Sequence, residues 1–352
     1  MLLPASVRFS KPKIQPKRFK SGKNTLPDNV FQERFSSQIR LPHIGLSGQE
    51  KLFQAKILVV GAGTLGCACL PWLVASGIGE IRLVDPDRIE PDNLARQVLY
   101  TEAELGQNKA LSAKTTLQRQ NPHLNLIAET QYATRESAQN WIKKADLVLD
   151  CADNVATSFL LDDLCRSAGK IFVSASAERF GGYVGAFNGN APAYRNIFPA
   201  LNEGTDCATS GILGAAGGVI GALQAQITIS LILGLDPSPL GKLFVWKGDE
   251  WRMETIIFYD APIKKTENYP VISLKEITAN DLLIDLRPKN SWPKINNALR
   301  ELPKNLSPEQ QDHRRIIFLC ETGALATKEA LEHQERGYRN LALCALNLEE
   351  NL

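Results

Sequence analysis

The feature that most constrains this chain is a regular alternation, from Lys56 onward, of short runs rich in β-branched residues with longer stretches of helical spacing. Such an alternation is typical of strands joined by right-handed helical crossovers into a mainly parallel sheet. It predicts a doubly wound, Rossmann-like α/β fold. The expected strands end at Val60, Asp85, Asp150 and Ser176 or centre on Leu126, Val184 and Val245, and the expected helices span 65–76, 108–120 and 154–168.

The 352-residue length and a shift in composition predict two domains. Residues 261–270 (APIKKTENYP) are polar, contain two prolines and lack periodicity, so we expect a linker there. The larger domain is expected over 31–260, and a second, smaller α/β pattern follows over 271–352. Residues 1–30 carry seven basic residues against one acidic residue and are expected to form a disordered tail.

Charge and cysteine usage limit the partners and the compartment. A formal net charge of +2 provides no global field that would attract nucleic acid or an anionic membrane. Residues 212–235 have no charged side chain, but glycines and polar residues interrupt this apolar run, so a buried or interface helix is expected rather than a membrane span. Seven cysteines in a long chain without a signal-peptide pattern indicate a reducing compartment, so we expect a cytoplasmic protein.

Three glycines follow the first expected strand. Gly61, Gly63 and Gly66 form the motif GAGTLG, which opens the next helix, so its backbone N–H groups and the helix N-terminus can face an anion. Glycine is required where a side chain would block close approach of the ligand. Asp85 ends the next strand, where a carboxylate can accept hydrogen bonds from ribose hydroxyls. These residues alone fit NAD as well as they fit ATP.

Polar residues near further strand ends favour a polyphosphate. The carboxyl ends of strands in an open α/β sheet share the edge at which ligands bind. Together, Arg96 and Lys109 carry more positive charge than is needed to bind the pyrophosphate bridge of NAD, and this charge suits a triphosphate. Asp153 is a natural Mg²⁺ ligand, because Mg²⁺ prefers one or two carboxylates together with phosphate oxygens. Besides the three glycines, the expected nucleotide-binding residues are Asp85, Asp87, Asn93, Arg96, Gln97, Lys109, Asp153 and Asn154.

The ordered set of motifs over about residues 31–260 resembles the ThiF/MoeB/HesA adenylyltransferases, which are bacterial relatives of ubiquitin-activating enzymes. The motifs are RFSSQIRLP, GQEKL, GAGTLG, DPDRIEPDNLARQ, GQNKA, DCADN and the glycine-rich run after Cys207. The resemblance implies a homodimer that uses ATP and Mg²⁺ to adenylate the Gly-Gly terminus of a ubiquitin-like sulfur-carrier protein of molybdopterin or thiamine synthesis. It implies that Asp85, Asn93, Arg96, Lys109 and Asp153 bind ATP and its metal, and that Arg96, Lys109 and Asp153 act in catalysis.

The sequence departs from this family in two places. Ser37 stands where most relatives carry a second basic residue of the RYxRQ motif, whereas Arg34 is retained. Many relatives hold a structural zinc with two CxxC pairs. Here the first pair would fall on Ala193–Asn196 and the second beyond Phe258, and neither segment contains a cysteine. We therefore expect no zinc site, with packing in place of the metal.

Two cysteines are candidates for covalent chemistry. Cys207 matches the crossover cysteine that takes the activated carrier as a thioester or acyl disulfide in several family members, and an unreactive cysteine is the alternative. Cys320 ends the expected strand IIFLC, and the loop ETGALA and the helix TKEALEHQER follow it. This order resembles a rhodanese domain and implies a persulfide on Cys320. Leu325 and Ala326 replace the basic and hydroxyl residues of the usual loop, so a weakened sulfur donor and a docking module both stay open.

Three functions are consistent with these observations. The leading one is a sulfur-carrier adenylyltransferase with a fused rhodanese-like domain that supplies sulfur. The second is an NAD-dependent oxidoreductase, since the glycine motif and Asp85 fit that cofactor too. The third is a non-catalytic scaffold that binds a ubiquitin-like carrier, because the zinc ligands and the second basic residue are lost. The motifs do not distinguish between thiamine, molybdopterin and other thiolated products.

Overall fold

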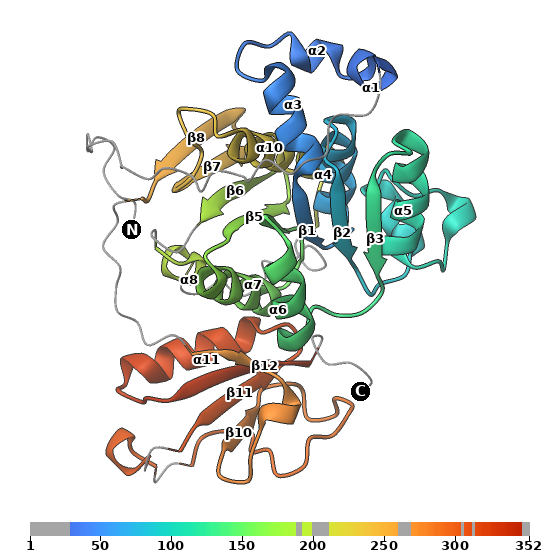
Figure 1. Cartoon of the computed structure of the whole chain (residues 1–352). Helices are drawn as coiled ribbons and strands as arrows, with labels where there is room; N and C mark the ends of the chain where they lie inside the picture. The colour runs from blue at the N-terminus through green and yellow to red at the C-terminus, as the bar shows by residue number, and fades with distance from the viewer. Residues whose placement is uncertain are drawn as a thin grey trace.

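The expected strands join one eight-stranded sheet, in the order β3-β2-β1-β4-β5-β6-β7-β8 (Figure 1). The computed structural model describes residues 29–187, 192–198, 211–259, 269–303, 306–311 and 314–346. Strands β1 to β5 are parallel, and β6 to β8 are antiparallel to their neighbours. The strands are β1 Lys56–Val60, β2 Glu80–Val84, β3 Asn125–Glu129, β4 Leu147–Asp150, β5 Ile171–Glu178, β6 Gly181–Phe187, β7 Lys242–Lys247 and β8 Arg252–Ile257. The mainly parallel, Rossmann-like fold is confirmed.

Helices cover both faces of this sheet. Helices α4, α5 and α10 share one hydrophobic core with one face, and α6 and α7 share a second core with the other face. Strands β1 and β4 lie in the middle and are buried on both faces, which explains their continuous apolar sequences. The helices are α4 Thr64–Ala75, α5 Lys109–Gln120, α6 Arg135–Lys144, α7 Val155–Ala168, α8 Tyr194–Ile197 and α10 Gly214–Leu233, preceded by α1 Asn29–Arg34, α2 Ser36–Ile39 and α3 Gly45–Gln54.

Helix α10 is the long apolar segment seen in the sequence. In the described part of the chain it alone is long and apolar enough to cross a membrane, and 61% of its most apolar window is buried inside the protein. It packs along α4 and against β5 and β6. Gly221 allows this approach, because a Cβ there would lie 2.6 Å from the Cβ of Ala68. The expectation of a buried helix is confirmed.

Some elements were not expected from the sequence. Helix α6 buries only Ala138, Trp141 and Ile142, so its polar composition resembles that of a loop. Strand β8 is an edge strand with mostly exposed residues and no alternating burial. Residues of this kind give little periodic signal, because periodicity in a sequence reflects a buried face.

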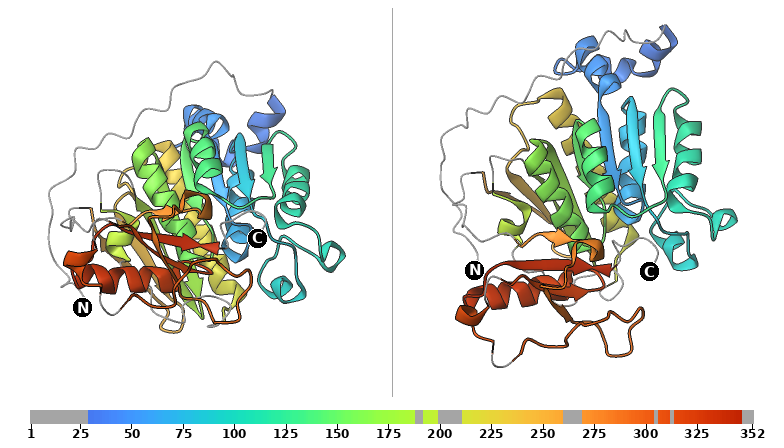
Figure 2. Two further views of the ribbon diagram at one scale, coloured as in Figure 1. Left: turned by 90° about the horizontal axis from the view of Figure 1, so that it is seen from below. Right: turned by 60° about the horizontal axis from the view of Figure 1, so that its bottom comes forward.

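A second sheet follows in the C-terminal unit, which we define as the described residues from 269 to 346. Its four strands are parallel in the order β10-β11-β12-β9. They are β9 Val271–Ile272, β10 Leu282–Asp285, β11 Ile316–Cys320 and β12 Leu341–Ala345, and helix α11 spans Ala324–Glu335. Figures 1 and 2 show this unit against the side of the large sheet that carries α6 and α7. The domain boundaries stay predictions, since residues 260–268 and most of the basic tail lie outside the described residues.

Candidate active site

The glycine motif forms a tight turn between β1 and α4. Gly61 has φ +102°, and a Cβ there would lie 2.4 Å from the carbonyl oxygen of Cys151. A Cβ on Gly66 would lie 2.3 Å from the carbonyl oxygen of Gly61. At Gly63, by contrast, the nearest atom to an added Cβ is Nε2 of Gln97 at 3.8 Å. Gly61 and Gly66 are therefore required by the turn itself, whereas Gly63 leaves open space in front of α4.

Asp85 ties this turn to the end of β2. Its carboxylate accepts hydrogen bonds from the backbone N–H groups of Ala62 at 2.6 Å and Asp87 at 2.9 Å. Burial and, to a smaller extent, the nearby charge of Asp87 raise the pKa of Asp85 to about 6, while Lys109 and the backbone N–H groups oppose the rise. Asp85 is thus ionised near neutral pH, with its two oxygens already oriented by the backbone.

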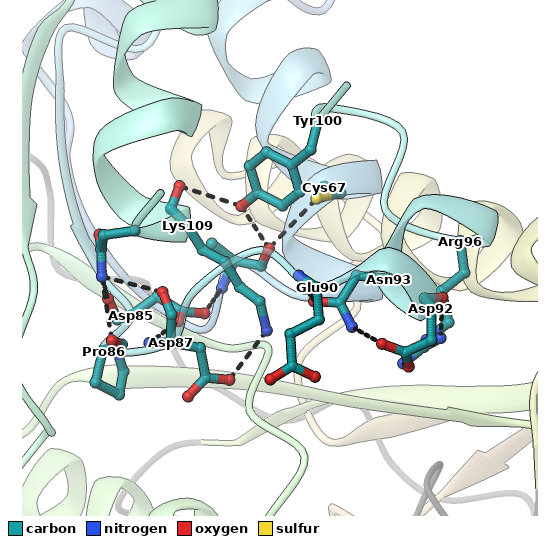
Figure 3. A network of polar contacts seen from close by, with 12 residues as sticks. Cys67, Asp85, Pro86, Asp87, Glu90, Asp92, Asn93, Arg96, Tyr100 and Lys109 are labelled. Carbon is teal, nitrogen blue, oxygen red and sulfur yellow. Dashed lines mark hydrogen bonds and ion pairs between the residues drawn. The ribbon is translucent and has the colours of Figure 1, made fainter. Parts of the chain in front are cut away.

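Lys109 begins α5 beside the same loop (Figure 3). Asn108 positions it: the Asn108 side chain caps α5 and donates to the carbonyl oxygens of Asp85, Pro86 and Asp87. The Lys109 Nζ lies 3.0 Å from Oδ2 of Asp87. Burial lowers the pKa of Lys109, but Asp85 and Asp87 outweigh this effect and raise it above its ordinary value. The ammonium group is therefore charged and held at the end of β2.

Arg96 follows a short 3₁₀ helix, Pro91–Ala95, at the other end of the network in Figure 3. Its guanidinium group donates to the backbone carbonyl of Asp92 at 2.7 Å and lies 3.1 Å from the Asp92 carboxylate. Asn93 is buried and donates to the same carboxylate at 2.9 Å. Both cations of the site are thus paired with acidic residues: Arg96 with Asp92 of its own loop, and the buried Lys109 with Asp87 of the loop after β2.

The end of β4 supplies the third group of residues. Asn154 caps α7 by accepting a hydrogen bond from the N–H of Thr157 at 2.8 Å. Asp150 is fully buried and accepts from the hydroxyl groups of Ser158 and Ser174, and burial raises its pKa to about 6. Asp153 lies in the loop between these residues, where its charge acts on Lys109. Asp150 and Asn154 therefore shape the loop that presents Asp153.

These residues surround one pocket of about 580 Å³. That volume lies within the range of small-molecule sites. The expected residues that line it are Gly61, Gly63, Asp85, Asp87, Asn93, Arg96, Gln97, Lys109, Asp153 and Asn154. Gly66 lies behind the turn, Cys320 does not line the pocket, and Cys207 falls outside the described residues.

Gln97 carries a direct sign that the pocket receives a ligand. Its side chain is 4% exposed, and Oε1 has no hydrogen-bond partner among the described residues. A buried polar atom without a partner is costly, and such atoms are commonly satisfied by a ligand or by water. The open space at Gly63 lies next to this side chain. Gln97 therefore lies where a ligand that approaches the turn would meet its side-chain amide.

Sequence reasoning missed several residues of the pocket. Tyr132 follows β3 and Ser158 lies in α7, while Ser176 and Tyr183 come from β5 and β6. A search for polar residues just after every strand would have found Tyr132. Thr322 comes from the C-terminal unit, and no local sequence pattern predicts its place in the pocket.

Comparison with known proteins agrees with this geometry. A sequence model of the ThiF family matches residues 35–271. The chain belongs to the ThiF family. It is also 42% identical over 217 residues to a Sus scrofa protein named "Adenylyltransferase and sulfurtransferase MOCS3", which covers 60% of this chain and 48% of that protein. The Drosophila grimshawi protein of the same name is 40% identical over 228 residues, which covers 63% of this chain and 51% of that one.

The ThiF chain thus spans about half the length of the curated relatives it matches. Among solved structures it resembles Escherichia coli MccB with ATP, at 24% identity and a TM-score of 0.58, over 66% of this chain and 73% of that one. The structure of E. coli MccB alone gives 23% identity and a TM-score of 0.59. At such identities the likeness supports the fold. The expected family and fold are therefore confirmed, whereas the rhodanese resemblance lies beyond residue 271 and stays a prediction.

The segment that would carry zinc ligands in ThiF relatives is packed with large side chains. Tyr194 contacts the rings of Phe159, Phe172 and Phe187. Arg195 is buried, lies 2.6 Å from the carboxylate of Asp163 and stacks over the ring of Phe159. An aromatic cluster and a buried ion pair therefore hold this segment. The second expected position lies partly outside the described residues.

Cys320 ends β11 and is 2% exposed. Its sulfur accepts hydrogen bonds from the backbone N–H groups of Gly323 at 3.1 Å and Ala326 at 3.4 Å. Burial nevertheless raises the pKa of the thiol above its ordinary value, and these N–H groups oppose the rise only in part. Cys165 is buried in the core that α6 and α7 share with the large sheet, and Cys344 is buried in a separate core of the C-terminal unit.

Arg34, the retained basic residue of the N-terminal motif, lies away from the pocket. Its guanidinium group donates to the carbonyl oxygen of Gln120, at the far end of α5. This position leaves Arg34 exposed on the surface of the chain, outside the residues that line the pocket.

Proposed function

We propose that this protein is an ATP-dependent adenylyltransferase that activates the C-terminal Gly-Gly carboxylate of a ubiquitin-like sulfur-carrier protein. The observation that carries the proposal is the single pocket that combines the glycine turn, Asp85, Arg96, Lys109 and Asp153. Membership of the ThiF family and the names of the MOCS3 relatives support it. We propose that the product serves sulfur transfer in molybdopterin or thiamine synthesis.

Each part of the pocket suits one part of ATP. The N-terminus of α4 behind Gly63 suits the phosphates, because its N–H groups attract negative charge. Asp85 suits the ribose hydroxyls, since its carboxylate is fixed at the end of β2. The partnerless Oε1 of Gln97 suits a donor of the nucleotide. Arg96 and Lys109 would exchange their carboxylate partners for phosphate oxygens.

Asp153 would hold Mg²⁺ together with phosphate oxygens. No group of three or more His, Cys, Asp or Glu side chains that suits a metal ion occurs in the described residues. A single carboxylate nevertheless fits Mg²⁺, which keeps several waters and is commonly bound through one or two carboxylates and the substrate phosphates. The ion would neutralise phosphate charge. The protein's own part is to fix Asp153 through the capped start of α7.

The proposed reaction needs charge neutralisation more than a base. The carrier carboxylate is already ionised near neutral pH, and one of its oxygens attacks the α-phosphorus of ATP. The bond to the bridging oxygen breaks, and pyrophosphate leaves with that electron pair. Both reactants are anions, so Arg96 and Lys109 would align them and stabilise the charge that develops on the phosphates.

Further parts of the proposal rest on the family resemblance. We propose that the protein is a homodimer and that it is cytoplasmic. The free state of all six cysteines in the described part of the chain is consistent with a reducing compartment. Cys207 is proposed to receive the activated carrier. Cys320 is proposed to carry sulfur, with the docking role as the alternative.

Carrier-dependent exchange of pyrophosphate into ATP tests the proposal. The full chain is mixed with ATP, Mg²⁺ and candidate Gly-Gly-terminated carriers, and a carrier without the two glycines is the control. Exchange that requires the terminal glycines supports adenylation. Carrier binding without exchange would favour the scaffold instead, and NADH binding would favour the oxidoreductase.

A further inference from the structure

The loop after Cys320 contacts the large domain directly. In this Cys320 loop, residues 320–323, the carbonyl oxygen of Thr322 accepts a hydrogen bond from the N–H of Ala156 at 3.3 Å. Ala156 lies in the first turn of α7. Gly323 has φ +87°, and a Cβ there would lie 2.6 Å from the Cβ of Ala156. The backbone of the loop thus packs on the start of α7 with no space for a side chain.

The same loop is part of the wall of the nucleotide pocket. Thr322 lines the pocket together with Asp153, Asn154 and Tyr132. Glu321 is close enough for its charge to raise the pKa of Tyr132, after the larger effects of burial and of Asp87 and Asp85. The pocket is therefore built from both parts of the chain, beside the residue proposed to hold the metal.

Contacts made by residues that do not line the pocket hold the C-terminal unit in place. Arg135 donates to the carbonyl oxygen of Val271 at 2.8 Å, and Arg195 donates to that of Tyr269 at 3.2 Å. Apolar residues of α7 share one core with Val271 and α11. This joint core indicates a specific docked arrangement, because it removes apolar surface of both parts from water.

Docking has a consequence for Cys320. Its thiol is 2% exposed and lies behind the loop that contacts α7. A reagent or partner reaches the sulfur only if the loop moves. In the docked position the loop therefore has two effects: it completes the pocket, and it covers Cys320.

We propose that the Cys320 loop forms part of the wall that contacts the bound nucleotide, so that nucleotide binding and access to Cys320 are coupled. This inference rests on the proposed function, because it takes ATP as the occupant of the pocket. A nucleotide that contacts the docked loop stabilises it and shields Cys320. By reciprocity, a loop that is displaced weakens nucleotide binding by the same factor.

Alkylation of Cys320 in the full chain tests this coupling. Iodoacetamide labelling is followed peptide by peptide by mass spectrometry, with and without ATP and Mg²⁺ at a concentration that saturates binding. We expect ATP to slow labelling of Cys320 at least severalfold. Cys344 is the internal control, because it is buried in the separate core on the other face of the same sheet. Its labelling is expected to stay unchanged.

The outcomes separate the two proposals. An unchanged Cys320 rate in a protein that binds ATP would overturn the coupling and leave the proposed function intact. Failure of the wild-type protein to bind ATP would overturn both. Equal protection of Cys320 and Cys344 would mean that ATP suppresses unfolding of the whole unit, and this too would overturn the coupling through the loop.

Two variants test the reciprocal effect. Ala156→Leu crowds Gly323 although Ala156 itself does not line the pocket, and Ala168→Leu places the same change at the exposed end of the same helix. Arg135→Ala removes the contact to Val271, and neither of these two residues lines the pocket. We expect Ala156→Leu and, less strongly, Arg135→Ala to speed Cys320 labelling and weaken ATP binding, with Ala168→Leu as wild type. Faster labelling with unchanged ATP affinity in both would contradict the proposal.

Discussion

The nucleotide pocket and the Cys320 loop are both built at the ends of parallel strands, but they handle charge differently. The pocket presents charged side chains, with Lys109 and Arg96 held by acidic neighbours. The Cys320 sulfur accepts hydrogen bonds from backbone N–H groups of the loop and of the first turn of α11, and Leu325 occupies the position of the expected cation. Fixed side-chain charges suit a polyanionic substrate, whereas a buried thiol without a cation remains protonated. The charged groups of the pocket are already in place for a substrate, whereas Cys320 becomes accessible only when its loop moves.

The largest effect is expected from the charged residues of the pocket. Lys109→Ala or Asp153→Ala is expected to lower carrier-dependent ATP–pyrophosphate exchange by about a hundredfold or more, because each removes a group that stabilises developing charge. Arg119→Ala is the matched control, since Arg119 lies at the exposed end of the same helix as Lys109. Unchanged exchange in both pocket variants would remove these residues from the mechanism.

The glycine turn gives the next contrast. Gly61→Ala is expected to lower the free energy of unfolding by about 1–3 kcal/mol, because its positive φ and its contact with Cys151 disfavour any side chain. Gly63→Ala is expected to leave stability within about 0.5 kcal/mol and to weaken ATP binding, since the methyl group enters the pocket. Thermal or denaturant unfolding and ATP titration measure the two effects. Equal changes in stability and in ATP affinity for the two variants would contradict the distinction between Gly61, which the turn requires, and Gly63, which faces the ligand space.

Acidification is expected to weaken ATP binding through Asp85. The pKa of Asp85 lies at about 6, so the carboxylate is ionised at pH 7 and becomes protonated as the pH falls through 6. A protonated carboxyl group is a poor acceptor of hydrogen bonds from the ribose hydroxyls. The affinity for ATP at pH 5 is therefore expected to be about tenfold lower than at pH 7. ATP titrations between pH 5 and pH 8 measure this. Asp85→Asn should bind more weakly at pH 7 and lose most of the dependence; a retained dependence would assign it to another group.

A smaller effect is expected from a cation placed in the first turn of α11, next to the Cys320 loop. Leu325 is 41% exposed, and its backbone N–H is among those that lower the pKa of Cys320. Leu325→Arg is expected to lower the pKa of Cys320, and Leu325→Gln, which adds no charge, should leave it unchanged. The pH dependence of Cys320 alkylation measures the shift. Identical profiles in the two variants would show that the sequence departure at Leu325 does not limit the thiol.

The sequence predicted the parts of the molecule that leave a local pattern. The strands ending at Val60 and Asp150 are buried on both faces, and the glycine motif must occupy a turn, so each is visible in a short stretch of residues. Residues such as Asp85 and Asp153 follow from the rule that ligands bind at strand ends. Thr322 was not predictable, because its place in the pocket depends on how the C-terminal unit docks. The partnerless Oε1 of Gln97 likewise emerges only from packing.

The most direct test of the central claim is the mass of the carrier itself. A Gly-Gly-terminated sulfur carrier is incubated with the full chain, ATP and Mg²⁺, and the intact carrier is measured by mass spectrometry beside a reaction with Lys109→Ala. We expect the carrier to gain one AMP group in the wild-type reaction and far less in the variant reaction. A carrier that binds the protein but never gains AMP, while ATP occupies the pocket, would contradict it.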